Sequence, residues 1–97
     1  MIRSKYYCLR PALGWFANEM ERKLQANDHK GGWEHMTMLA LLRRLRQETD
    51  ELETAIKNGN LIRGEVVDEA ADVANFAMMI ADIYSDLQEQ EREALQP

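Results

Sequence analysis

The feature that most constrains the fold of this 97-residue chain is the segment AADVANFAMMIA, residues 70–81. On a helix these residues would be apolar almost all the way round, so neighbours must cover the helix on more than one side. Only Asp72 and Asn75 interrupt the apolar run, and both residue types are unfavourable in the middle of a helix. Because a buried, unpaired carboxylate costs several kcal/mol, Asp72 needs a compensating partner.

The segment before this helix predicts two further helices. Pro11 suits the first turn of a helix that continues to about Gln25 or Asn27. Residues 27–33, with a Gly pair at 31 and 32, have no helical period and are expected to form a loop. Thr37 can cap a second helix, which ends at residues 58–60 because Gly and Asn accept the left-handed conformation. The apolar stripe of this second helix consists of Leu39, Leu42, Leu45, Leu52 and Ile56.

The third helix is expected to begin between Leu61 and Glu65 and to continue to at least Leu87. Residues 88–97 are either a frayed extension of it or part of a short fourth helix, and residues 1–9 form a lead-in without periodicity. The chain is thus predicted to be a single all-α domain over residues 1–97, an antiparallel bundle of three to four helices. Because its third helix is apolar on two sides, we expect oligomerisation into a homodimer or a tetramer.

Composition excludes several classes of partner and compartment. The 12 Lys and Arg against 17 Asp and Glu give a formal charge of -5, which disfavours binding to a nucleic-acid polymer. A single cysteine, Cys8, excludes an internal disulfide or a cysteine-rich zinc site and suits the cytoplasm. No apolar run approaches the roughly 20 residues of a membrane span, and the N-terminal residues do not resemble a signal peptide.

Two short acidic pairs indicate a metal site. Glu48-x-x-Glu51 lies on the predicted second helix and Glu69-x-x-Asp72 on the third, and residues three apart share a helix face. The connection over residues 52–68 is short enough for antiparallel neighbours, so the pairs can face each other. Four converging carboxylates repel one another unless a hard divalent cation lies between them. The sequence therefore predicts a Mg²⁺ site, at which Mn²⁺ can substitute.

Three residues near this site allow two interpretations each. Arg44 shares a face with Glu48 and Glu51, either as a surface ion pair or as a direct contact to a substrate. Trp33 either plugs the end of the bundle or stacks on a ligand. Lys30 is either a solvated loop charge or a phosphate contact. Other metal chemistry fits less well, because neither His29 nor His35 stands three residues after a Glu, as di-iron bundles require.

The two acidic pairs, with the context EAADVANF around the second, resemble the MazG-like, all-α nucleoside triphosphate pyrophosphohydrolases over roughly residues 33–84. The resemblance implies a Mg²⁺-dependent hydrolase that converts a nucleoside triphosphate to the monophosphate and pyrophosphate. Its catalytic metal ligands would be Glu48, Glu51, Glu69 and Asp72, with Glu48 or Glu51 as the general base. Substrate contacts would come from Asn75 near the sugar or phosphates, Lys30 and Arg44 at the phosphates, and Trp33, Phe16, Asn18 and Met20 near the base.

A second class of function is a non-enzymatic helical interaction module. In that case the acidic residues are solvated and the apolar faces bind another protein. The two classes differ in one expectation: a four-acid site is stabilised by Mg²⁺ or Mn²⁺, whereas a solvated acidic face is not.

Overall fold

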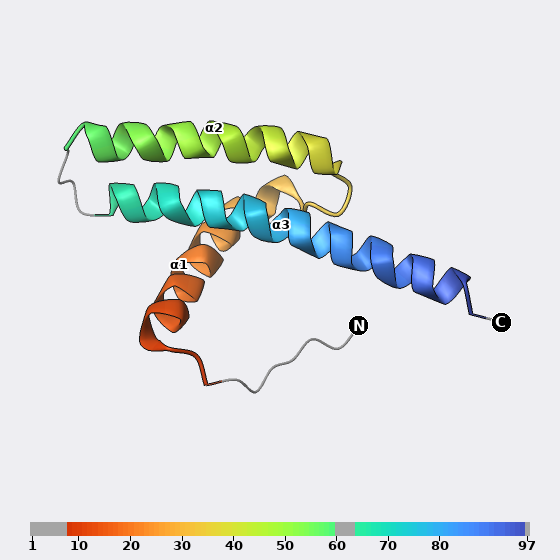
Figure 1. Cartoon of the computed structure of the whole chain (residues 1–97). Helices are drawn as coiled ribbons and strands as arrows, with labels where there is room; N and C mark the ends of the chain where they lie inside the picture. Colours follow the sequence, from red (N-terminus) through yellow and green to blue (C-terminus); the bar gives the residue numbers. More distant parts are fainter. Residues whose placement is uncertain (1–7, 60–63, 97) are drawn as a thin grey trace.

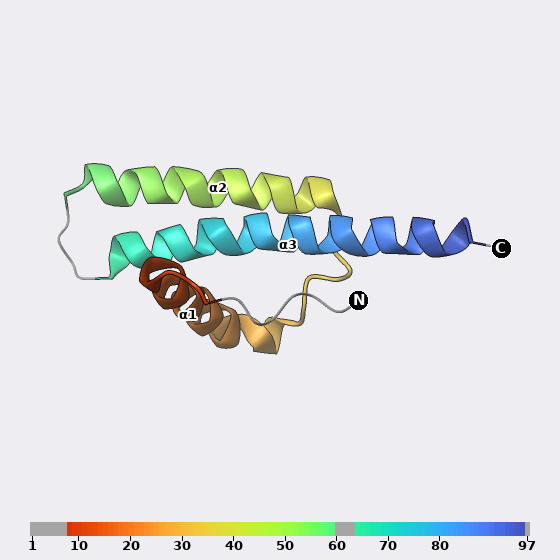
Figure 2. The same ribbon diagram turned by 60° about the horizontal axis from the view of Figure 1, so that its bottom comes forward.

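A computed structural model of the chain describes residues 8–59 and 64–96, which contain three α-helices and no strand. These are α1 (Pro11–Asn27), α2 (Met38–Lys57) and α3 (Glu65–Ala94), with a 3-10 turn, η1 (Asp28–Lys30), after α1. Helices α2 and α3 lie antiparallel, and α1 crosses α3 at a steep angle (Figures 1 and 2). The predicted all-α class is confirmed.

Local signals determine the helix ends as the sequence predicts. Pro11 occupies the first turn of α1, and the Thr37 hydroxyl accepts a hydrogen bond from the Ala40 N–H at 3.1 Å, capping α2. Gly59 follows α2 with φ +56°, and Gly64 precedes α3 with φ +102°. Both values lie in the left-handed region that glycine adopts without strain. Residues 60–63, which include part of the predicted break, lie outside the described residues.

The C-terminal segment is an extension of α3 rather than a separate helix. Helix α3 is continuous to Ala94 and projects beyond the end of α2 (Figure 1). Residues 88–94, predicted as a frayed or separate tail, are therefore helical. The predicted lead-in falls largely on residues 1–7, which lie outside the described residues. None of the described helices is long and apolar enough to cross a membrane.

The residues of α2 that are buried against α3 differ from those of the apolar stripe predicted from the sequence. Leu41, Glu48 and Ala55, which recur every seven residues, are the buried residues of α2, and Leu41 is 0% exposed. Leu39 and Ile56, assigned to the stripe from the sequence, are exposed, Leu39 by 74%. That part of the prediction is wrong for the isolated chain, because α3 covers one side of α2 and leaves these residues at its margin.

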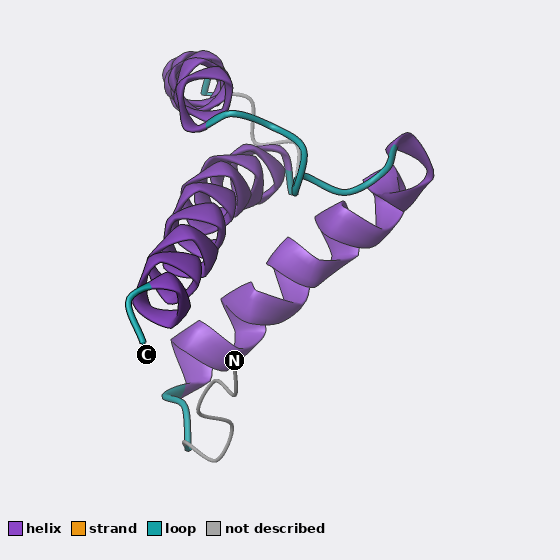
Figure 3. Cartoon of the chain, turned by 90° about the vertical axis from the view of Figure 1, so that its right-hand side faces the viewer, coloured by secondary structure: helices purple, strands orange, loops and turns teal. Residues whose placement is uncertain are grey.

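Helix α1 lies on the other side of α3 from α2 (Figure 3), and its Phe16, Met20 and Leu24 are half-buried. None of its residues is fully buried. Polar contacts between α1 and α3 include the Arg22–Asp68 ion pair, the Lys23–Asp72 ion pair, and a hydrogen bond from Asn75 Nδ2 to the Met20 carbonyl. The α3 residues of these contacts are spaced by four and three, so they form one polar line along the helix. This line includes Asp72, a predicted metal ligand.

Candidate metal centre and adjoining pocket

Three of the four predicted metal ligands converge. Glu48 and Glu51 of α2 and Glu69 of α3 each bring a carboxylate oxygen within 4.8 Å of the other two. The antiparallel pairing of α2 and α3 brings these residues together. Asp72 lies outside this group, and its Oδ2 is 3.3 Å from Nζ of Lys23 on α1.

Two carboxylate oxygens in the cluster are buried without a partner. Glu48 is only 6% exposed; its Oε1 accepts a hydrogen bond from Arg44 at 3.2 Å, whereas its Oε2 has no hydrogen-bond partner. Oε2 of Glu69 is also buried and unpartnered. A buried acceptor without a donor carries its full desolvation penalty, which is larger for a charged group. The cluster therefore favours a state in which a cation or a proton occupies the space between the acids.

The pKa values of Glu48 and Glu69 also indicate that negative charge is unfavourable in this cluster. Burial raises the pKa of Glu48 to about 7, and the neighbouring carboxyl group of Glu51 and the charge of Asp72 act in the same direction, against Arg44. Burial also raises the pKa of Glu69, with the charges of Glu51 and Asp72 adding to it and Lys23 opposing it. Near neutral pH Glu48 thus retains part of the proton that an ordinary glutamate would have released.

The donor set fits a hard divalent cation. All three groups are carboxylates, which Mg²⁺ prefers, and the buried unpartnered oxygens supply lone pairs that need a positive partner. Neighbouring ligands of one octahedral Mg²⁺ are about 3 Å apart and opposite ones about 4.2 Å, given metal–oxygen distances of about 2.1 Å. The three oxygens lie within 4.8 Å of one another, so the side chains would have to rotate inward to share one ion.

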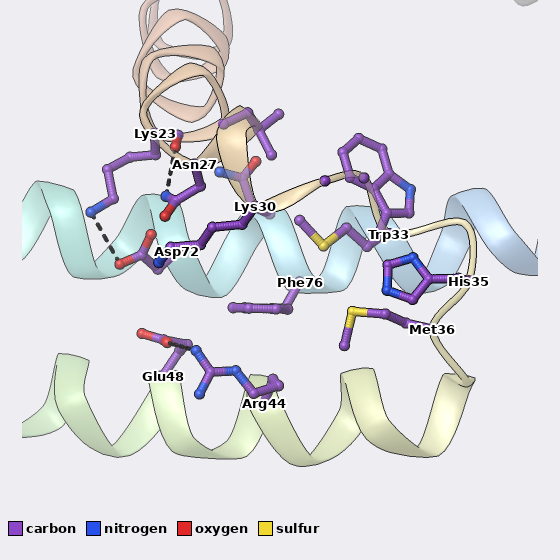
Figure 4. Close-up of a pocket in the computed structure, with 15 residues that line it drawn as sticks. Lys23, Asn27, Lys30, Trp33, His35, Met36, Arg44, Glu48, Asp72 and Phe76 are labelled. Atoms are coloured by element: carbon purple, nitrogen blue, oxygen red, sulfur yellow. Dashed lines mark hydrogen bonds and ion pairs between the residues drawn. The ribbon is translucent and has the colours of Figure 1, made fainter.

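A pocket of about 410 Å³ opens beside the cluster, between α1, the loop that follows it, α2 and α3. The pocket has two chemically different ends (Figure 4). Lys23, Asp72, Glu48 and Arg44 lie at one end, and Trp33, His35 and Met36 lie at the other, with Phe76 between them. A volume of this size falls in the range of small-molecule sites. The division suits a ligand with a charged part and a flat or apolar part.

The structure brings some of the predicted substrate residues to this pocket and not others. Lys30, Trp33, Arg44 and Asn75 line it. Phe16, Asn18 and Met20 are not among the lining residues: Asn18 is exposed, the ring of Phe16 lies 5.9 Å from that of Trp15, and Met20 offers its backbone carbonyl to Asn75. A contact of these three side chains with a base therefore has no support from the geometry.

For Trp33 and Arg44 the sequence allowed either a structural role or a contact with a ligand, and the structure is compatible with both roles at once. Nε1 of Trp33 donates a hydrogen bond to Oδ2 of Asp82 at 2.9 Å, which fastens the loop to α3 while the side chain lines the pocket. Arg44 donates to Glu48 and lies over the ring of Phe76, with its guanidinium carbon 5.3 Å from the ring centroid. Both side chains are thus structural contacts and walls of the pocket.

Sequence reasoning missed Lys23. The residue lies on α1, lines the pocket and pairs with Asp72. The local signal for this role is weak: Lys23 is next to Leu24 and three residues after Met20, at the border of the apolar face. The contact depends on how α1 docks on α3, which the sequence pattern does not specify.

Comparisons with protein-family models, with characterised proteins and with solved structures found no match to this chain. What the site does is therefore inferred from its residues and their geometry.

Proposed function

We propose that this protein is a Mg²⁺-dependent nucleotide pyrophosphohydrolase that cleaves a nucleoside triphosphate between its α and β phosphates. One observation carries the proposal: an acid cluster with two buried, unpartnered oxygens lies beside a pocket that is charged at the cluster end and aromatic at the other. A nucleoside triphosphate has the same division between its phosphates and its base. The resemblance of the two acidic pairs to the MazG-like signature supports this assignment.

Each acid has a role in this proposal. Glu48, Glu51 and Glu69 would hold the metal ion, with Asp72 as the fourth ligand. A bound Mg²⁺ would neutralise the triphosphate, polarise the α-phosphorus and lower the pKa of the attacking water. Either Glu48 or Glu51, whichever keeps an oxygen free of the metal, accepts the proton of that water. The raised pKa of Glu48 supports this role, because a site that favours a proton on a buried carboxylate also favours a bound cation.

The remaining pocket residues would orient the substrate. Arg44 and Lys30 add positive charge near the phosphates, while Trp33 and Met36 offer an aromatic ring and a thioether to the base. Asn75 is only 4% exposed, and its Nδ2 is used by the Met20 carbonyl, so its Oδ1 is left as a buried acceptor at the pocket wall. An O–H or N–H donor of the nucleotide would satisfy it.

The test is a substrate panel. Purified protein is incubated with each deoxy- and ribonucleoside triphosphate and Mg²⁺, and products are separated by anion-exchange chromatography. We expect a monophosphate and pyrophosphate from at least one substrate, and a loss of about 100-fold or more in kcat/KM for Glu69→Gln and Asp72→Asn. Glu53→Gln, an exposed acid of α2 paired with Lys57, is the matched control. Release of orthophosphate, no reaction, or full activity in the two variants would contradict the proposal.

We also propose that the chain self-associates. The exposed apolar side chains on which this rests are equally compatible with the second candidate function. Among the described residues, the fully buried hydrophobic ones are Leu41, Ala55 and Ala71, while large apolar side chains stay exposed on all three helices. A homodimer or tetramer would cover them. A non-enzymatic interaction module would present the same faces to another protein. Thermal unfolding with and without Mg²⁺ or Mn²⁺ distinguishes the two, because only a metal site gains stability from the ion.

A further inference from the structure

Lys23 connects α1 to the acid cluster. Its ammonium lies 3.3 Å from Oδ2 of Asp72, and each of the two side chains is only 23% exposed. A partly buried pair keeps more of its Coulomb attraction than an exposed pair, because water and salt screen it less.

The other nearby cations are placed differently. Arg22, the preceding residue, pairs with Asp68 and Glu19, and none of these residues lines the pocket. Arg44 lines the pocket but donates to Glu48 and Gln47 and lies over Phe76. Lys30 also lines the pocket, from the exposed turn η1. Lys23, like Arg44, faces the pocket and pairs with a predicted metal ligand, but it reaches the site from α1, and its partner Asp72 lies outside the three-acid group (Figure 4).

We infer that Lys23 is a positioning residue that couples the metal centre to the phosphates of the substrate. Its ammonium holds Asp72 while the site lacks metal, and it donates to a phosphate oxygen once a divalent cation has taken Asp72 and the nucleotide has bound. This inference rests on the proposed function and adds a residue and a coupling to it. Lysine suits such an exchange, because its ammonium is a compact charge on a flexible stem and binds phosphate as a point charge.

The exchange has two consequences of opposite sign. Without substrate, Lys23 competes with the metal for Asp72 and repels it, so it weakens metal binding. With metal present, Lys23 adds a charge-assisted hydrogen bond to the phosphates, so it strengthens their binding. A lysine that only tethers α1 to α3 would affect stability and neither of these affinities.

Calorimetric titration of Lys23→Met tests this, with Mg²⁺ alone and with pyrophosphate at saturating Mg²⁺ as the two ligands. We expect Mg²⁺ alone to bind about threefold tighter or more, as removal of one nearby positive charge predicts. We expect pyrophosphate to bind about tenfold weaker or more, as loss of one charge-assisted hydrogen bond predicts. In kinetics KM for the nucleotide should rise more than kcat falls, and Lys23→Arg should retain most of the pyrophosphate affinity.

The matched control is Arg22→Met, which removes the adjacent ion pair between α1 and α3 outside the pocket. It should lower the melting temperature and leave both affinities within about twofold of wild type. If Lys23→Met destabilises the fold too far, Lys23→Gln, which keeps a hydrogen-bond donor, replaces it in the comparison. The inference fails if Lys23→Met behaves like Arg22→Met, or if it weakens Mg²⁺ and pyrophosphate binding together. If one of these results is obtained but the wild-type protein binds pyrophosphate in the presence of Mg²⁺, only the inference about Lys23 is wrong. If the wild-type protein binds neither Mg²⁺ nor pyrophosphate, the proposed function is wrong as well.

Discussion

Among single residues, Glu48 carries the clearest conflict between burial and charge. Glu48→Gln replaces the buried carboxylate with a neutral group of the same shape, whose oxygen still accepts from Arg44. Because the charge is disfavoured in the fold, we expect the metal-free variant to melt several degrees higher than wild type near pH 8. It should also lose the gain in melting temperature that Mg²⁺ gives. Glu53→Gln is the control, and a variant that melts lower yet keeps the Mg²⁺ effect would contradict the assignment.

The pH dependence of stability follows from the same residue. The pKa of Glu48 is raised from 4.5 to about 7, so the folded chain binds this proton more tightly than the unfolded chain. Its contribution to stability is present below about pH 4.5 and is lost as the pH rises through about 7. Mg²⁺ requires the deprotonated acid, so stabilisation by Mg²⁺ should grow over the same range.

Melting curves from about pH 5 to about pH 8, in EDTA and in excess Mg²⁺, measure both trends. In EDTA the wild-type melting temperature should fall more steeply than that of Glu48→Gln, which lacks the titrating group. A Mg²⁺ effect of equal size at both ends of the range would show that Glu48 is not a ligand.

The residues that sequence reasoning placed well are those with local signals. Thr37, Pro11 and Gly59 act on their own turn of the chain, so their roles follow from residue type and position. The convergence of Glu48, Glu51 and Glu69 was also predictable, because a short connection makes α2 and α3 antiparallel. Lys23 was not, since its contact with Asp72 joins residues that are distant in sequence and depends on the docking of α1.

At the level of elements, a hydrogen bond from Trp33 to Asp82 joins the loop between η1 and α2 to α3. Trp33→Phe keeps a ring at the pocket and removes the N–H that donates to Asp82 at 2.9 Å. A hydrogen bond to a charged group contributes about 1.5–3 kcal/mol, so we expect lower stability and faster amide exchange in residues 31–37. Hydrogen exchange measured by mass spectrometry should show no comparable change in α2. Unchanged exchange in the loop would mean that Trp33 is held by its ring alone.

The positions of the helices were more predictable from the sequence than the sides on which the helices are buried. The apolar run of residues 70–81 predicted cover on more than one side; α2 and α1 lie on two sides of α3, but only Ala71 and Asn75 of the run are buried, and Ala77 and Ala81 are exposed. The stripe on the second helix was predicted correctly only in part: Leu42, Leu45 and Leu52 are half-buried, whereas Leu39 and Ile56 are exposed. Apolar spacing identifies several possible faces, and the choice between them depends on the neighbour. In the structure the buried residues of α2 are Leu41, Glu48 and Ala55, which recur every seven residues and include a predicted metal ligand.

At the level of the whole molecule, the exposed apolar side chains predict self-association. Leu39 and Ile56 on α2, Leu13 and Trp15 on α1, and Tyr84 and Leu87 on α3 are all more than two-fifths exposed. Scattered apolar residues are normal on a surface, but here they accompany a core with few fully buried side chains. A second copy would give this 11.3 kDa chain the buried area that its own fold lacks.

Light scattering coupled to gel filtration should therefore give a mass of at least twice 11.3 kDa. The melting temperature should rise with protein concentration, because dissociation accompanies the unfolding of an oligomer. Leu39→Glu and Ile56→Glu test the margin of α2 that α3 leaves uncovered, and Glu53→Gln, on the same helix, serves as the control. If Leu39 or Ile56 lies in the interface between copies, its glutamate variant should have a lower mass, and its melting temperature should depend less on protein concentration. A monomeric wild-type mass at about 100 μM, with a melting temperature independent of concentration, would show that the isolated chain is stable with these residues in water.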